Sequence, residues 1–305
     1  MKILSIDGGG IRGLIPALVL AEIERRTGRR IGQLFDLIAG TSTGGIIACA
    51  LAKPEPLTAE DVAELYVDEG PEIFRKGLLK RLVSVEGLID ERYDDDGLNS
   101  VLARHLGDAR LSDCTPDILV TAYDITARFA FFFRSSRAHS DPTYDFRLAA
   151  VARATSAAPT YFEPFEVTDE AGARTYPLVD GGVYAVNPGM CAYAEAVGEV
   201  QLLASLGTGT HGRGHDFDDA RSWGQVEWAR PLLDIVFDGV ADTVEFQLAA
   251  LLGQDLFRLQ TELRAASGDL DDAGERNLAA LQRDAERLIR ERSADIDALC
   301  ARLVR

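Results

Sequence analysis

A serine within a glycine turn is the clearest candidate for chemistry in the sequence. Residues 40–44 read Gly-Thr-Ser-Thr-Gly and match the pattern G-x-S-x-G, with Ser42 at the centre. Apolar residues at 35–39 predict a strand before this turn, and those at 46–52 predict a helix after it. Such a turn holds the serine oxygen clear of the backbone, and the positive end of the helix faces it. The pattern therefore predicts a nucleophile at Ser42, with an ordinary glycine-rich turn as the alternative.

A second glycine cluster, at residues 8–13, has two interpretations. Its spacing fits the dinucleotide fingerprint G-x-G-x-x-G, and Asp36 lies about 20 residues further on, where a ribose-binding acid is expected. Two features weigh against a nucleotide. Asp7 would place its carboxylate near a pyrophosphate, and Asp36 lies near the start of its predicted strand rather than at the carboxyl end. Spacing alone leaves a nucleotide-binding or regulatory module open as an alternative.

The other interpretation of this cluster is an oxyanion hole. The consecutive glycines Gly8, Gly9 and Gly10 can turn their backbone N–H groups toward one point, because no Cβ obstructs them. The N–H of Thr43, directly after the candidate nucleophile, would be a further donor. Together these groups would stabilise the negative oxygen of a tetrahedral intermediate.

A serine nucleophile needs a base, and the sequence offers two kinds. Asp180 ends an apolar stretch at 176–179, and the two glycines after it allow a sharp turn. In a hydrolase with the order serine, acid, histidine, only His211 or His215 could follow Asp180. Both histidines flank a short Gly-Arg-Gly segment that is typical of a surface loop. Asp180 is therefore the stronger candidate, with a histidine-dependent esterase as the alternative.

The elements that must position these residues follow an α/β pattern. Alternating strands, glycine turns and helices are typical of a parallel sheet whose sites lie at the carboxyl ends of the strands. The pattern predicts helices at 15–26 and 146–156, and further strands at 2–6, 118–123, 129–133, 176–179 and 200–206.

Beyond residue 222 the pattern becomes helical. Apolar residues recur there at spacings near three and four, at Leu278, Leu281, Ala285, Leu288, Ile296, Leu299 and Leu303. This periodicity predicts one or two amphipathic helices packed on the core or on a partner subunit. In the second case the protein would be a homo-oligomer. We divide the chain into a catalytic domain over residues 1–215 and a helical extension over residues 216–305.

Composition excludes several classes of function. The 305 residues include 32 lysines and arginines against 49 aspartates and glutamates, a net charge of −17. A nucleic-acid surface needs clustered positive charge, so nucleic acid is not an expected partner. The four cysteines are too widely spaced for a CxxC site, and neither a metal nor an organic cofactor is expected.

The start of the chain indicates a cellular location. Met1 and Lys2 lead directly into the first predicted strand, without the pattern of a signal peptide. No stretch approaches the roughly 20 apolar residues of a membrane span. We therefore expect a cytoplasmic protein that contacts membranes at most peripherally.

The motifs taken together resemble the patatin-like phospholipase family, in particular its bacterial members. The resemblance covers residues 2–210. Each motif alone is common, but their order and spacing are specific together, and none departs from the family pattern. They lie at residues 7–13, 40–45 and 180–182, with supporting stretches at 154–159, 187–188 and 205–209.

The resemblance implies a three-layer α/β/α sandwich with a mainly parallel central sheet, distinct from the α/β hydrolases. Family members hydrolyse lipid acyl esters with a serine–aspartate dyad and no histidine, so Ser42 would be the nucleophile and Asp180 the general base. The loop at 8–10 would form the oxyanion hole. Arg12 occupies the position of a basic residue that holds the lipid phosphate in some members.

The same resemblance implies the substrate. It would be a phospholipid or another membrane-derived ester, cleaved as by a phospholipase A or a lysophospholipase. Some bacterial members are activated by a cyclic nucleotide. The sequence neither supports nor excludes such a small-molecule activator here.

Overall fold

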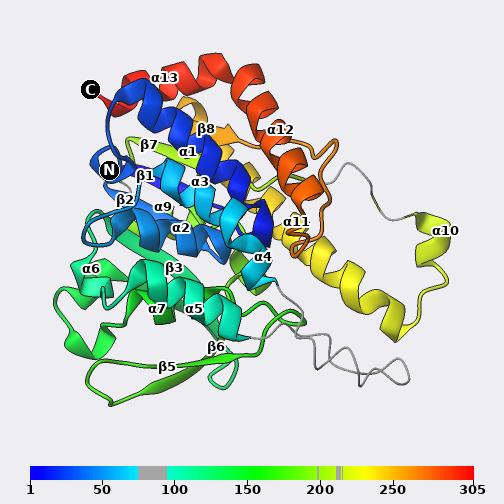
Figure 1. Cartoon of the computed structure of the whole chain (residues 1–305), viewed down its shortest axis with the longest axis horizontal. Coiled ribbons are helices and arrows are strands. Elements are labelled where there is room, and N and C mark those ends of the chain that lie inside the picture. The colour runs from blue at the N-terminus through cyan, green and yellow to red at the C-terminus, as the bar shows by residue number, and fades with distance from the viewer. Residues whose placement is uncertain (75–94, 198, 211–213, 215) are drawn as a thin grey trace.

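A mixed, mostly parallel sheet runs through the centre of the molecule (Figure 1). The structure is a computed structural model and describes residues 1–74, 95–197, 199–210, 214 and 216–305. Within them, the strand order is β5-β6-β3-β2-β1-β7-β8, and β4 pairs with β3 beside this path. The strands are β1 (Lys2–Ile6), β2 (Leu37–Thr41), β3 (Asp117–Asp124), β4 (Phe129–Arg134), β5 (Phe165–Thr168), β6 (Thr175–Asp180), β7 (Leu202–Leu206) and β8 (Leu256–Leu259).

Strand β3 divides the sheet into two parts. On one side, β2, β1, β7 and β8 continue in parallel. The strands β4, β5 and β6 are antiparallel to their neighbours. Strand β4 takes one edge of β3, so β2 and β6 must share the other edge, where β2 pairs with its first five residues and β6 with its last three. The ends of β2 and β6 therefore meet at the middle of β3.

Helices cover both faces of the sheet, as expected of an α/β/α sandwich. In β1, Leu4 and Ile6 face a large core formed with α1, α2, α3, α7 and α12, and Ile3 faces a smaller core formed with α9 and α11. The helices are α1 (Leu14–Thr27), α2 (Thr43–Ala52), α3 (Ala59–Asp68), α4 (Gly70–Ile73), α5 (Asp95–Leu106), α6 (Ser135–Ala138), α7 (Leu148–Thr155), α8 (Gly182–Ala185), α9 (Gly189–Glu195), α10 (Phe217–Ala220), α11 (Gln225–Leu252), α12 (Glu275–Glu291) and α13 (Ser293–Leu303).

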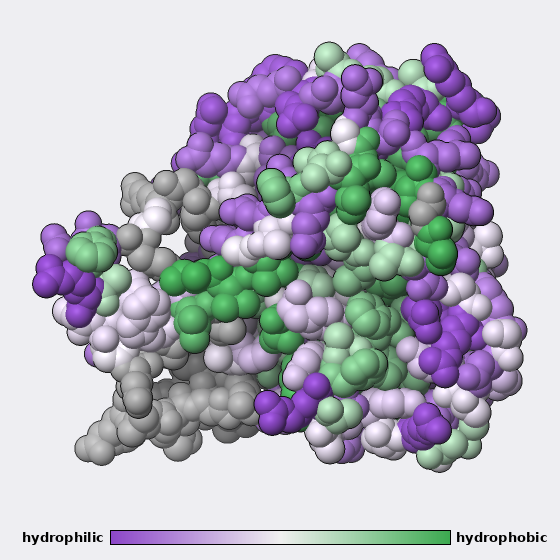
Figure 2. Space-filling model, turned by 180° about the vertical axis from the view of Figure 1, so that it is seen from behind, coloured by the Kyte–Doolittle hydropathy of each residue, from purple (hydrophilic) through white to green (hydrophobic). Residues whose placement is uncertain are grey.

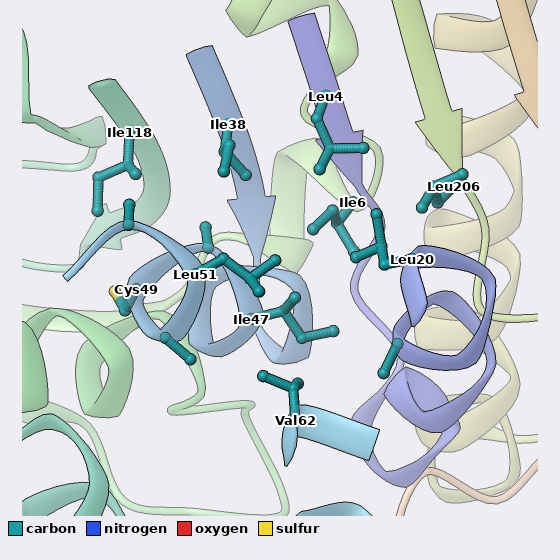
Figure 3. Close-up of a cluster of buried hydrophobic side chains, with 14 of the residues drawn as sticks. Leu4, Ile6, Leu20, Ile38, Ile47, Cys49, Leu51, Val62, Ile118 and Leu206 are labelled. Carbon is teal, nitrogen blue, oxygen red and sulfur yellow. The ribbon is translucent and has the colours of Figure 1, made fainter. Parts of the chain in front are cut away.

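The larger core joins the first strands to the first helices. Figure 3 shows Leu4, Ile38 and Ile118 on three neighbouring strands, pointing toward Ile47 and Leu51 on α2. All five side chains are almost completely buried. Full burial of each stabilises the fold by about 1.5–3 kcal/mol. This packing fixes the strand and the helix on either side of the turn at residue 42.

The C-terminal third belongs to the same body. The predicted amphipathic periodicity is confirmed, since its apolar residues on α12 and α13 lie in the larger core, against α1. The expectation of helices alone missed β8, which extends the sheet in parallel with β7. Contacts therefore cross residue 215 at several places. The division of the chain into domains at that residue stays a prediction.

The face of the molecule that is turned away from the viewer in Figure 1 is partly apolar. Figure 2 views the molecule from that side and shows a band of hydrophobic residues among polar ones. Helix α11 contributes exposed apolar side chains, among them Trp228, Leu232, Ile235 and Phe246. Among the described helices, α11 included, none has the length and hydropathy needed to cross a bilayer.

Candidate active site

Ser42 lies at the turn between β2 and α2, as the pattern predicted. Its φ of 55° and ψ of −121° are sterically unfavourable for a residue with a side chain. The turn is tight because a Cβ at Gly40 would lie 2.1 Å from the carbonyl oxygen of Gly44. A Cβ at Gly44 would lie 2.2 Å from the carbonyl oxygen of Ile6, so both glycines of the pattern are required for steric reasons.

Three threonine hydroxyls hold the backbone beneath Ser42. The Ser42 N–H donates to Oγ1 of Thr155 at 2.8 Å, and that hydroxyl donates to the carbonyl of Thr121 at 2.7 Å. The hydroxyls of Thr41 and Thr121 are hydrogen-bonded at 2.7 Å, and Thr41 donates to the carbonyl of Ala185. This buried network offsets the strained backbone conformation of the turn.

Strand register brings Asp180 to Ser42. On the shared edge of β3, Thr41 pairs with Thr121 and Asp180 pairs with the next residue, Ala122. Because β2 and β6 run toward each other there, the chain must leave the sheet at the end of each strand. A Cβ at Gly181 would lie 2.1 Å from Oγ1 of Thr121, so only glycine allows β6 to turn away at that point.

The carboxylate of Asp180 is buried and hydrogen-bonded. Its Oδ1 accepts from the N–H of Gly182 at 2.7 Å. Burial raises the pKa of Asp180 to about 7, although the nearby Ser42 hydroxyl and the Gly182 N–H act to lower it. A carboxylate with this pKa can accept and return a proton near neutral pH.

The glycine loop follows β1 and lies beside Ser42, but one of its predicted donors is already used. The N–H of Gly8 donates to the carbonyl of Val186 at 2.9 Å. This corrects the assignment of Gly8 as an oxyanion donor. A Cβ at Gly8 would lie 3.4 Å from the Cβ of Ser42, which is ordinary van der Waals contact and shows how closely the loop approaches the serine.

The remaining predicted donors are the N–H groups of Gly9, Gly10 and Thr43. Thr43 is the first residue of α2, where backbone N–H groups have no partner within the helix. Gly10 has a φ of +56°, and a Cβ there would lie 2.2 Å from the carbonyl oxygen of Leu270. A Cβ at Gly9 would lie 2.3 Å from Oγ1 of Thr208. Both positions therefore require glycine for steric reasons.

These residues line one cavity at the carboxyl ends of the parallel strands. It contains Ser42, Thr43, Asp180 and the glycine loop, together with Arg12. Arg12 donates from Nε to the carbonyl of Gly9 at 3.3 Å, and burial lowers the pKa of its guanidinium. The rest of the wall is largely apolar and includes Ile11, Ile46, Tyr66, Ile73, Phe74, Leu98, Tyr161, Phe162, Phe237, Ala241 and Leu270.

The structure argues against the nucleotide interpretation. Asp36 precedes β2 and accepts a hydrogen bond from the N–H of Lys2 at 2.7 Å, so it lies at the opposite end of β1 from the glycine loop. A ribose-binding acid would have to lie at the same end as the loop. Asp7 lines the cavity, where its carboxylate would face a pyrophosphate.

The structure bears on the histidine alternative only in part. His211 and His215 lie outside the described residues. His105 contacts Glu69, and His139 contacts Asp117. Neither of these two histidines lines the cavity.

Sequence reasoning missed three residues that support the site. Thr155 holds the Ser42 N–H, Arg258 pairs with Asp7, and the carbonyl of Leu270 accepts from the N–H of Ile11 at 2.9 Å. Thr155 lies in a stretch that the family resemblance included, which is a usable signal. For Arg258 and Leu270 the sequence has no local signal, because their partners lie at the other end of the chain.

Comparisons with known proteins identify the family of the chain. Residues 4–191 match the family model of the patatin-like phospholipases. The chain is 32% identical to patatin-like protein 2 of Arabidopsis thaliana, over 97% of this chain and 84% of the plant protein. It is also 32% identical to patatin-like protein 1 of rice, Oryza sativa subsp. indica, over 100% of this chain and 84% of that protein.

A solved structure also matches. The crystal structure of VipD from Legionella pneumophila aligns with 94% of this chain and 66% of that one, at 9% identity and a TM-score of 0.37. The family model and the plant relatives carry the assignment. The chain belongs to the patatin-like phospholipase family and is a lipid acyl hydrolase acting on ester bonds.

Proposed function

We propose that the protein cleaves ester-linked fatty acids from phospholipids through a dyad of Ser42 and Asp180. Ser42 Oγ attacks the ester carbonyl carbon while Asp180 takes its proton. The oxyanion accepts hydrogen bonds from the N–H groups of Gly9, Gly10 and Thr43. The carbon–oxygen bond to the leaving alcohol then breaks, and Asp180 returns the proton to that alcohol.

The second half of the reaction uses the same groups. Water attacks the acyl-serine while Asp180 takes a proton from it, and collapse of the second oxyanion breaks the bond to Ser42 Oγ. Ser42 recovers its proton and the fatty acid leaves. Every proton that leaves a nucleophile thus passes through one carboxylate, which requires a pKa near the working pH.

One observation carries this proposal. Ser42 shares a cavity with an apolar wall with a carboxylate that is 3% exposed, has its pKa raised by burial and is influenced by the Ser42 hydroxyl. A serine activated by an adjacent base is the arrangement expected of nucleophilic catalysis. The apolar wall suits an acyl chain, and Arg12 at the same cavity suits a phosphate group.

Several finer expectations stay predictions. They are an affiliation with the bacterial members of the family, since the relatives compared above come from plants, and a cytoplasmic location with peripheral membrane contact. Self-association through the C-terminal helices and activation by a cyclic nucleotide belong with them. Nothing in the described cavity depends on any of the four.

An active-site probe tests the proposal. A fluorophosphonate should label the wild-type protein at Ser42 and should not label Ser42→Ala. Ser136→Ala is a matched control, because its hydroxyl is exposed and donates to Glu195 away from the cavity. Fatty-acid release from phosphatidylcholine should be lost with the label. Equal labelling of wild type and Ser42→Ala would overturn the assignment of the nucleophile.

A further inference from the structure

A row of polar residues crosses the buried face of the sheet behind the glycine loop. Ser5 of β1, Ser205 of β7 and Arg258 of β8 are register neighbours on three adjacent strands. Asn187 joins the row, accepting from the Ser5 hydroxyl and donating to the Ser205 hydroxyl, each at 3.2 Å. The row ends at Asp7, the residue directly before the glycine loop.

Arg258 uses all three of its guanidinium nitrogens in this row. Nη2 donates to Asp7 Oδ2 at 2.7 Å, Nη1 to the Ser205 hydroxyl at 2.9 Å, and Nε to Glu245 at 3.1 Å. The side chains of Arg258 and Asp7 are only 10% and 3% exposed. A charge buried to this extent is costly unless it is paired, so each residue depends on the other.

Apart from Arg258, few groups compensate the buried charge of Asp7. Its second oxygen, Oδ1, is buried and has no hydrogen-bond partner within the described part of the chain. Burial raises the pKa of Asp7, and the charge and hydrogen bond of Arg258 oppose that effect. Without Arg258, an uncompensated carboxylate would lie in the cavity wall, one residue before the loop.

The glycine loop directly follows Asp7, so the position of Asp7 sets where the loop begins. The Asp7 N–H donates to Leu206, the Gly8 N–H donates to Val186, and the Gly8 carbonyl accepts from the Thr208 hydroxyl at 2.7 Å. The side chain of Asp7 is the group at the base of the loop that carries a charge. A displacement there would move the N–H groups of Gly9 and Gly10, and misplaced oxyanion donors lower turnover more than substrate binding.

We propose that Arg258 is a positioning residue for the reaction, which holds the oxyanion loop and neutralises Asp7 through their buried ion pair. This inference rests on the proposed function. It assigns a role in catalysis to β8, which lies outside the residues that match the family model. Arg258 itself does not line the cavity, so it acts through Asp7 and the loop.

The test compares kcat and KM for hydrolysis of a p-nitrophenyl acyl ester. Arg258→Met should lower kcat by about 10- to 100-fold with KM within about twofold of wild type, because only the transition state uses the oxyanion donors. Arg302→Met is the matched control. It removes another arginine–aspartate pair of 2.7 Å, between Arg302 and Asp255, away from the cavity, and it should leave kcat unchanged.

A double variant separates charge compensation from simple packing. Asp7→Asn in the Arg258→Met background removes the unpaired carboxylate and should recover several-fold of the lost kcat, whereas a packing role predicts no recovery. Arg258→Lys keeps the charge but not the three-way hydrogen bonding, and should fall between wild type and Arg258→Met. If Arg258→Met does not fold, Arg258→Lys and the double variant decide the question.

The outcomes are distinct. The inference is overturned if Arg258→Met matches Arg302→Met in kcat, if its defect lies in KM, or if the double variant is no better than the single one. With Arg258→Met unfolded, wild-type kcat in Arg258→Lys overturns it. If wild type itself shows no hydrolysis that depends on Ser42, the proposed function fails instead.

Discussion

The two walls of the cavity are built from different parts of the chain. The wall with Ser42 and Asp180 comes from strands that meet on one edge of β3, and hydroxyls within residues 41–155 hold it. The wall with the glycine loop follows β1, but groups in the last third of the chain help to hold it, namely Thr208, Arg258 and Leu270. Nucleophile and base are therefore placed by strand ends on the edge of β3, whereas the oxyanion loop also depends on contacts with the last third of the chain.

The largest effect should come from the first wall. Asp180→Asn keeps the shape of the side chain and removes its basicity, so turnover should fall by about 10³-fold or more. Asp124→Asn is a control, because that carboxylate is also buried but accepts from the N–H groups of Thr126 and Ala127 in a turn. Initial rates of ester hydrolysis measure the difference. Retention of a tenth of wild-type activity in folded Asp180→Asn would refute the dyad.

The second wall should respond to added bulk. Gly10→Ala places a Cβ against the Leu270 carbonyl, and we expect kcat to fall by about 10²–10³-fold, as for loss of one oxyanion donor. Gly107→Ala is the matched control, since φ is +55° at Gly107 and +56° at Gly10 but the space around Gly107 is open. Both variants carry the same backbone strain, which Tm measures, whereas only Gly10→Ala adds the clash beside Ser42, which kcat measures. Equal kcat values would show that Leu270 does not restrict the loop.

The pKa of Asp180 gives a third test. The base must be ionised, so kcat/KM should fall about tenfold per pH unit below a pKa near 7 and reach a plateau above it. The rate of fluorophosphonate labelling should follow the same curve, because it uses the same nucleophile. A profile that is flat from pH 5 to pH 8 would contradict a base with a raised pKa.

The pH dependence of stability should also reflect the raised pKa of Asp180, but here ionisation of the group is unfavourable. A carboxyl group whose pKa is higher in the folded than in the unfolded protein stabilises the fold at low pH and loses that contribution as pH rises toward 7. Asp180→Asn does not titrate, so the Tm of the variant minus that of wild type should increase between about pH 4 and pH 7. Parallel Tm curves over that range would contradict the raised pKa.

The smallest expected effect concerns the histidines. Replacing both His211 and His215 by alanine should leave kcat/KM within about twofold, because Asp180 alone serves as the base in the proposed mechanism. His105→Ala is a control for a histidine outside the cavity, where it contacts Glu69. Loss of activity in the double variant alone would favour a histidine-dependent esterase.

The same division explains what could be predicted from the sequence. The strand, turn and helix around Ser42 follow from residues within about 20 positions, and so does the turn after Asp180. The sandwich followed from the alternation of such units and from the family resemblance. Patterns of this kind depend on local periodicity and turn chemistry, which the sequence displays directly.

The rest depended on tertiary contacts. Strand β8 has only four residues after a long helix, and its Arg258 pairs with a residue 251 positions earlier. Whether the Gly8 N–H is available depends on where Val186 lies, and glycine spacing cannot indicate that. The glycine loop does lie beside Ser42, and the Gly8 N–H is engaged elsewhere, so Gly8 was wrong as a donor and the oxyanion role of the other N–H groups stays a prediction.

The contact between Leu270 and the glycine loop has a consequence for the order of synthesis. A nascent chain that has emerged only as far as residue 215 already contains Ser42 and Asp180. It lacks the carbonyl that accepts from Ile11 and the guanidinium that pairs with Asp7. The groups that handle protons are thus made first, and two of the groups that hold the oxyanion loop are made last. A ribosome-bound chain of that length would carry the nucleophile and the base beside a loop that lacks two of its supports, and these supports arrive only with β8 and the segment around Leu270.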